Sequence, residues 1–199
     1  MSNDYDLLRM SKILKKQLDE ERYQHTLGVM YTAAALAMAY GYDLLKAQVA
    51  GLLHDCAKGI PDEKKLSMCK DHNIPVTNIQ EKNPYLLHGI LGAYLAKTEY
   101  KVEDESILSA ITYHTTGRAD MHILERIIYI ADFIEPMRDK SANLSGIRKI
   151  AFHDLNECMY EILKSTLTYL FHSNPENIDS ATQNAYVYYK QLHDLASSG

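Results

Sequence analysis

Cysteine and long apolar runs are scarce in this chain of 199 residues. Its three cysteines, Cys56, Cys69 and Cys158, are scattered and form no C-x-x-C pair. An odd number at irregular spacing argues against a disulfide framework and predicts reduced thiols. The longest apolar candidate, residues 31–40, falls short of the ~20 residues of a membrane helix, and the first residues lack the apolar core of a secretion signal. We therefore expect a cytoplasmic protein that does not enter a membrane.

Clustered positive charge is missing as well. The formal net charge is −5, and a mildly acidic chain is poorly suited to grip nucleic acid, whose phosphates need clustered Lys and Arg. A nucleotide needs only a few local cations, so nucleotide binding stays open. The length and the ordinary share of hydrophobic residues, 46%, fit one globular domain over residues 1–199.

Helical periodicity runs through almost the whole sequence, whereas strand signals are weak. The β-prone segment "YVYYK" (186–190) lies in a helical context, so we expect it to be helical. Asp43 and the Asn83-Pro84 pair are suited to begin helices. The pattern predicts an all-α helical bundle with helices over 5–19, 22–40, 44–57, 62–72, 84–99, 103–114, 120–135, 145–172 and 177–196.

Six polar side chains stand out because each lies in an otherwise apolar helix. They are His25, His54, Asp55, His88, His114 and Asp132. The other five histidines, His72, His122, His153, His172 and His193, have the setting of ordinary core or surface residues. Glycine costs a helix roughly 1 kcal/mol against alanine. Its occurrence close to these side chains, at Gly28, Gly51, Gly89 and Gly92, predicts close helix packing around a shared point.

The types of these side chains indicate a metal site. Asp132, inside "IIYIADFI", needs a cation if it is buried, either a divalent metal or a buried Lys or Arg. Imidazole and carboxylate ligands together suit iron, manganese, cobalt or zinc. The adjacent His54 and Asp55 point ~100° apart on a helix, so both reach one ion only near the helix end. Gly51 and Gly59 on either side allow the helix to end there.

Five segments in order carry a resemblance to a known family. They are "ERYQHTLGV", "HDCAK", "NPYLLHGILGA", "AITYHTTGR" and "ADFIEPMR". Together they resemble the HD-domain metal-dependent phosphohydrolases, and most closely the bacterial YqeK family of symmetrical diadenosine tetraphosphate hydrolases, which have an iron site. The resemblance is in register over residues 20–138 and looser to 190. The chain departs from the family after Arg138, where "DKSANLSG" replaces a Pro-Gly step.

The resemblance implies a role for each matching residue. The first metal ion would be held by His25, His54, Asp55 and Asp132. His88 and His114 would face the substrate phosphates or ligate a second ion. The phosphates or nucleotide would also be contacted by Arg22, Lys58, Arg138 and Asn174, the last from a loop at 171–179. The implied fold is a single HD domain with its core at about 20–140, whose C-terminal helices at about 145–196 complete the nucleotide pocket.

The chemistry expected of these residues is phosphoanhydride hydrolysis. A bound transition metal lowers the pKa of water towards ~7, and the resulting hydroxide attacks a β-phosphorus of the dinucleoside tetraphosphate. Two nucleoside diphosphates, ADP or GDP, then leave. We expect the catalytic residues to be Asp55 between metal and water, Lys58 at a phosphoryl oxygen, and His88 or His114 as proton donor. Iron is the expected metal, as one or two ions.

Other interpretations remain open from the sequence alone. The same residues would serve an HD enzyme for (p)ppGpp, deoxynucleoside triphosphates or nucleoside mono- and diphosphates. HD-like modules can also bind without catalysis, although those typically lose metal ligands, and a helical bundle can carry coincidental histidines. Lys58 and Arg138 can be solvated, with Arg138 paired to Glu135 or Asp139. The Tyr- and Ala-rich segments 31–40 and 185–189 fit either the core or a homodimer contact.

Overall fold

The computed structural model describes residues 5–139 and 143–198, and over these residues the chain is helical with no strand. The first half contains α1 (Leu7–Gln17), α2 (Glu20–Ala39), α3 (Leu44–Leu53), α4 (Asp62–Asp71), α5 (Asn78–Lys82), the 3₁₀ turn η1 (Pro84–Leu87) and α6 (His88–Thr98). The second half contains α7 (Glu105–Tyr113), α8 (Ile123–Ile134), α9 (Leu144–Ile150), α10 (Leu155–Ser173), the turn η2 (Pro175–Asn177) and α11 (Ser180–Ser197). The predicted all-α class is confirmed, and "YVYYK" lies within α11.

Aspartate caps begin most of the long helices. In each case the carboxylate accepts a hydrogen bond from a backbone N–H two or three residues further on, which satisfies a group that the helix leaves without a partner. The capping residues are Asp6, Asp19, Asp43, Asp104, Asp154 and Asp179. Asp43 therefore acts as expected. Asn83 does not, because its side chain donates back to the Ile79 carbonyl and η1 intervenes before α6 begins at His88.

Three other, larger differences separate the helices of the structure from the sequence prediction, and the remaining ends differ by at most three residues. The helix expected over 44–57 ends at Leu53, after which short turns such as Lys58 N–H to the Asp55 carbonyl, 2.9 Å, carry the chain onward. The helix expected over 145–172 is two helices, because Asp154 caps a new one at Leu155. The short helix α5 was not predicted; its Thr77–Gln80 capping box stabilises five residues that show little periodicity.

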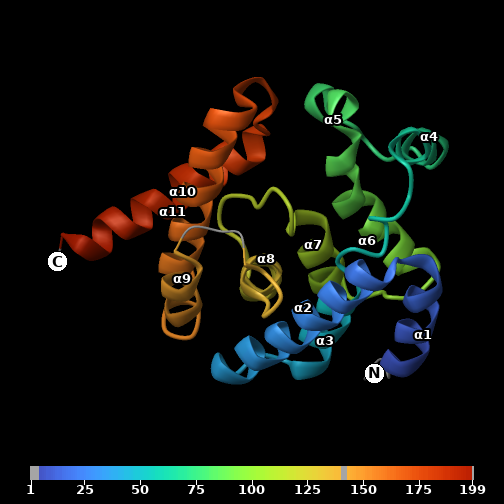
Figure 1. Cartoon of the computed structure of the whole chain (residues 1–199), viewed down its shortest axis with the longest axis horizontal. Coiled ribbons are helices and arrows are strands. Elements are labelled where there is room, and N and C mark those ends of the chain that lie inside the picture. Colours follow the sequence, from blue (N-terminus) through green and yellow to red (C-terminus); the bar gives the residue numbers. More distant parts are fainter. Residues whose placement is uncertain (1–4, 140–142, 199) are drawn as a thin grey trace.

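Helices α2, α3, α7 and α8 pack together at the centre of the molecule (Figure 1). Helix α6 lies against α7, and the pair α10 and α11 stands on the other side against α8. Two glycines permit the closest contacts. A Cβ on Gly51 would lie 2.9 Å from the Met30 Cα, and one on Gly89 would lie 2.6 Å from the Thr112 carbonyl oxygen. Close packing at these glycines is therefore present, between α3 and α2 and between α6 and α7.

The apolar segments left open by the sequence divide between core and surface. Leu36 and Tyr189 are fully buried, whereas Tyr31, Met38 and Val187 are 64%, 66% and 53% exposed. A homodimer contact through those exposed side chains remains a prediction. Within residues 5–139 and 143–198, no helix is both long enough and apolar enough to cross a bilayer.

Candidate active site

The six polar residues singled out in the sequence come together where five helices meet. His25 lies in the second turn of α2, His54 and Asp55 follow α3 directly, and His88 is the first residue of α6. His114 follows α7, and Asp132 lies in the last turn of α8. Their ligand atoms form three overlapping groups, each within 4.8 Å: His25, His54 and Asp55; His54, His114 and Asp132; and Asp55, His88 and His114. Residues more than a hundred positions apart thus share one centre.

Each histidine ring has its Nδ1 atom held by an acceptor. His54 Nδ1 donates to the Gly51 carbonyl and His114 Nδ1 to the Ile111 carbonyl, both over 2.7 Å. His88 Nδ1 donates in the same way to the Tyr85 carbonyl. A carbonyl oxygen can only accept, so the hydrogen of each neutral ring lies on Nδ1, and the lone pair of Nε2 faces the centre. This is the orientation that metal-binding histidines require.

Asp55 lies between two pairs of rings and turns a different oxygen to each. Its Oδ2 atom is 3.6 Å from His54 Nε2 and 3.9 Å from His25 Nε2. Its Oδ1 atom is 3.3 Å from His88 Nε2 and 3.5 Å from His114 Nε2. The side chain is 4% exposed. One carboxylate therefore connects both halves of the cluster.

Burial fixes the charge states in the cluster. His54 is completely buried, which lowers its pKa to about 4, and burial together with the neighbouring His114 lowers the pKa of His88 to about 3. Burial opposes ionisation of Asp55, but its electrostatic interaction with His54, its hydrogen bond with His114 and its contact with His88 hold the pKa of Asp55 well below its usual range. His54 and His88 are consequently neutral at neutral pH and lie beside the ionised carboxylate of Asp55.

Two arginines pair with the two aspartates at the edge of the cluster. Arg22 Nη1 lies 2.9 Å from Asp55 Oδ2, and Arg138 Nη2 lies 2.7 Å from Asp132 Oδ1. The Arg138 partner is thus Asp132 rather than Glu135 or Asp139. Burial disfavours the charge on Asp132, yet the hydrogen bond from His25 and the nearby charges keep the pKa of Asp132 far below normal. The arginine that the sequence offered as the alternative to a metal near Asp132 is present, and the contact that it makes with the carboxylate is to Oδ1.

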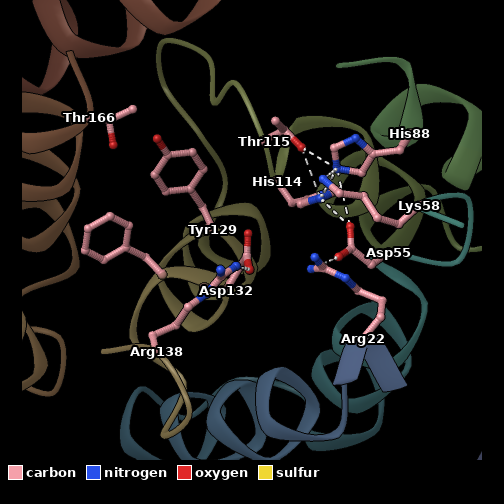
Figure 2. A pocket seen from close by; sticks show the side chains of 11 residues that line it. Arg22, Asp55, Lys58, His88, His114, Thr115, Tyr129, Asp132, Arg138 and Thr166 are labelled. Carbon is pink, nitrogen blue, oxygen red and sulfur yellow. Dashed lines mark hydrogen bonds and ion pairs between the residues drawn. The ribbon is translucent and has the colours of Figure 1, made fainter. Parts of the chain in front are cut away.

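A cavity of about 140 Å³ opens beside these side chains. Figure 2 shows Lys58, His88, His114 and Thr115 gathered on one side of it, with Tyr129 and Thr166 on the other. Lys58 Nζ lies 3.3 Å from His88 Nε2, and its burial lowers the pKa of the ammonium group. Lys58 is therefore a lining residue of the cavity and not a solvated lysine at a helix end.

Several lining residues were not found from the sequence. Thr115 places its hydroxyl 2.9 Å from His88 Nε2 and 3.1 Å from His114 Nε2. Its position directly after His114 in "HTTGR" was the available signal. Tyr129 and Phe133 line the cavity from the helix of Asp132, and Tyr129 precedes that aspartate by three residues on the same face. Thr166 comes from α10, and no motif in its local sequence indicates that it lines a cavity.

Some residues do not join the cluster. Asn174 lies at the end of α10, is exposed, and does not line this cavity. The five histidines expected to be ordinary lie elsewhere. For example, His72 stacks on Tyr94, and His193 pairs with Glu157 over 2.7 Å. A contact between Asn174, in the loop at 171–179, and the nucleotide stays a prediction.

The donor set fits a divalent metal ion. Neutral Nε2 atoms and ionised carboxylate oxygens converge in a largely buried space, and such acceptors repel one another without a cation among them. His54 Nε2 is the clearest case, because it is buried and has no hydrogen-bond partner. Imidazole and carboxylate ligands with Nδ1 hydrogens held by carbonyls match the requirements of first-row metals.

Comparison with known proteins agrees with this geometry. The family model described as HD domain matches residues 22–137. The chain is 43% identical over 161 residues to a protein of Bacillus subtilis (strain 168) named "Bis(5'-nucleosyl)-tetraphosphatase, symmetrical", covering 81% of this chain and 86% of that protein. It is 40% identical over 163 residues to a protein of the same name from Halalkalibacterium halodurans, covering 82% and 86%.

A solved structure is similar over nearly the whole chain. The crystal structure from Clostridium acetobutylicum, described as a "predicted HD superfamily hydrolase involved in NAD metabolism", superimposes with a TM-score of 0.90 at 39% identity, covering 94% of this chain and 98% of that one. The matched family segment begins at Arg22 and ends just before Arg138, so it contains all six residues of the cluster. The chain belongs to the HD domain family.

Proposed function

We propose that this protein hydrolyses diadenosine tetraphosphate symmetrically, giving two molecules of ADP. The names of the relatives in Bacillus and Halalkalibacterium support this substrate. The observation on which the proposal rests is the placement of Asp55, whose two oxygens face two pairs of imidazole Nε2 atoms at the wall of a cavity lined with cations. That arrangement suits metal-assisted phosphoryl transfer to water.

The proposed metal ligands follow the overlapping groups of the cluster. His25, His54, Asp55 and Asp132 would hold a first divalent ion, with iron the proposed metal. Asp55 would also reach a second ion, held with His88 and His114. A bound ion supplies Lewis acidity at a phosphoryl oxygen and a nearby water of lowered pKa. His88 is neutral because its pKa is about 3, which favours the role of ligand over that of proton donor.

The cationic side chains of the cavity would bind the tetraphosphate. Arg22 and Arg138 each present a planar fork, which can hold two phosphate oxygens once substrate competes with Asp55 and Asp132 for them. Lys58 offers a compact ammonium group close to His88. We propose that these three groups align the central anhydride and compensate the charge that builds up on it.

The reaction is balanced by one water molecule. Its oxygen bonds to one β-phosphorus, the bond from that phosphorus to the central bridging oxygen breaks, and the second ADP leaves with the bridging oxygen. A water hydrogen ends on the departing phosphate or is released to solvent. Thr115, whose hydroxyl is 2.9 Å from His88 Nε2, is placed to donate a hydrogen bond to substrate oxygens on that side.

A product assay tests the proposed function. Purified protein loaded with iron or manganese should convert diadenosine tetraphosphate to ADP alone, and Asp132→Ala should lose both bound metal and turnover. Formation of ATP plus AMP, or no reaction, would contradict the symmetrical cleavage. Faster turnover of (p)ppGpp, a deoxynucleoside triphosphate or a nucleoside diphosphate in the same panel would assign the chain to another HD activity.

The three cysteines support a cytoplasmic location. All are free and buried in the structure, as reduced thiols in a reducing compartment would be. A fractionation of the native host with an antibody against the protein tests this proposal.

A further inference from the structure

Two glutamates are almost completely buried among the described residues, Glu125 and Glu135, each 1% exposed. The contacts of Glu125 are structural: it accepts from Arg118 and from the backbone N–H of His122, 2.7 Å, at the start of α8. Glu135 lies at the other end of the same helix, beside the metal cluster. The two residues thus have equal burial and different neighbours.

Glu135 holds the ring of His25. Its Oε1 atom is 3.0 Å from His25 Nδ1. A carboxylate oxygen accepts, so Nδ1 carries a hydrogen and donates it to Glu135. His25 Nε2 faces Asp132 Oδ1, 3.0 Å away. Burial opposes the charged ring, but the hydrogen bonds with Asp132 and Glu135 raise the pKa of His25 above its usual value. The other three rings of the cluster are held by backbone carbonyls. Among the four described rings, His25 is the only one whose Nδ1 atom is held by a side chain rather than by a backbone carbonyl.

The same carboxylate also holds the turn that leads to Arg138. Its Oε2 atom accepts from the Met137 backbone N–H over 2.7 Å, and the Arg138 backbone N–H donates to the Glu135 carbonyl over 3.0 Å. The Arg138 side chain then returns to Asp132. Glu135 therefore contacts both a proposed metal ligand and the segment that carries a proposed phosphate ligand.

Gly28 provides the space for this carboxylate. It lies three residues after His25 in α2, and a Cβ at that position would be 2.6 Å from Glu135 Oε2. Real Cβ atoms do not approach so closely, so any larger residue would displace the Glu135 side chain. The absence of a side chain at Gly28 thus leaves room for the Glu135 carboxylate. A substitution at Gly28 would shift Glu135 without altering any charge.

We propose that Glu135 is a positioning residue that fixes the ring of His25 for metal binding and the turn of Arg138 for phosphate binding. The inference rests on the proposed metal site. Partners of this kind typically change metal affinity by about 10- to 100-fold when they are replaced. Replacing the carboxylate by an amide should weaken metal binding, because the single acceptor oxygen of the amide cannot serve both the His25 Nδ1 hydrogen and the Met137 backbone N–H. It should also raise KM for the substrate, because the Met137–Arg138 turn loses its anchor.

The test compares Glu135→Gln with its matched control Glu125→Gln. Metal affinity is measured by competition with a fluorescent chelator, and thermal unfolding is followed on the same samples. We expect Glu135→Gln to bind Mn²⁺ about 10- to 100-fold more weakly, and Glu125→Gln to bind as the wild type does although its Tm falls. Equal loss of affinity in both variants, or unchanged affinity in Glu135→Gln, would overturn the proposal.

Gly28→Ala provides a second route that leaves every ligand and charge in place. It should lower Mn²⁺ affinity in the same direction as Glu135→Gln. A Gly28→Ala protein with wild-type affinity would count against Glu135. These readouts need no turnover, so a protein that binds metal but leaves diadenosine tetraphosphate intact would overturn only the proposed function.

Discussion

The Nε2 atoms of His88 and His114 lie 3.0 Å apart, although each ring already donates its Nδ1 hydrogen to a backbone carbonyl. Two bare lone pairs at this distance repel one another unless a donor or a cation lies between them. The Thr115 hydroxyl can donate to only one of them at a time, and the Lys58 ammonium group lies 3.3 Å from His88 Nε2. Helices α6 and α7 therefore hold these rings in an arrangement that needs a donor or a cation beside it.

Metal removal should accordingly destabilise the fold. An ion present at about 100 times its Kd stabilises a protein by about 2.7 kcal/mol, which corresponds to roughly 5–10 °C in Tm for a chain of this size. We expect dialysis against a chelator to lower Tm by this amount, and Mn²⁺ or Fe²⁺ to restore it. Scanning calorimetry of the two forms is the measurement. Identical Tm values with and without the ion would show that it does not bind the folded cluster.

Replacing Arg138 by lysine should weaken substrate binding while keeping the charge. The guanidinium fork can hold two phosphate oxygens, and a lysine cannot reproduce this geometry. A hydrogen bond between charged groups contributes about 1.5–3 kcal/mol, so kcat/KM should fall about 10- to 150-fold. Steady-state kinetics should place most of the loss in KM. Arg9→Lys, at an exposed position on α1, is the control, and an equal loss in both variants would exclude a specific role for Arg138.

Gly89→Ala should separate His88 from His114. A Cβ on Gly89 would meet the Thr112 carbonyl at 2.6 Å, and backbone cannot move aside as a side chain can. Overpacking of this kind costs about 1–3 kcal/mol. We expect a lower Tm and weaker metal binding, measured by calorimetry and chelator competition. Gly92→Ala on the same helix is the comparison, because its Cβ would meet a side-chain atom of Ile111 at 3.3 Å and should have a smaller effect.

Asp104→Asn should change the dependence of stability on pH. Burial opposes the charge of Asp104, but hydrogen bonds from Lys46 and Ser106 lower the pKa of this carboxyl below its usual value. A folded-state pKa below the unfolded value, ~3.9, contributes stability above that pH and loses it as the pH falls through the folded pKa. The Tm difference between wild type and variant should thus shrink below about pH 4. A difference that stays constant with pH would contradict this account.

Local sequence was enough to locate most helices and the cluster residues. Asp43 could be recognised as a cap because the interaction involves only the next turn, and His54–Asp55 because two polar residues end an apolar run. The sequence did not predict that α3 ends at Leu53. The turns at 54–59 pack against α1 and α6, and local sequence carries no signal for such distant contacts. Nor could it show that residues 145–172 form two helices, because periodicity continues across Asp154.

The residue types at the site, and hence the metal and phosphate chemistry, were determined by the sequence, since imidazole, carboxylate and guanidinium groups carry their chemistry wherever the chain places them. Only the tertiary structure decided that Arg138 pairs with Asp132 and that Glu135 holds His25. The physical reason is distance. Glu135 and His25 are 110 positions apart, and only the packing of α2 against α8 brings them within a hydrogen bond.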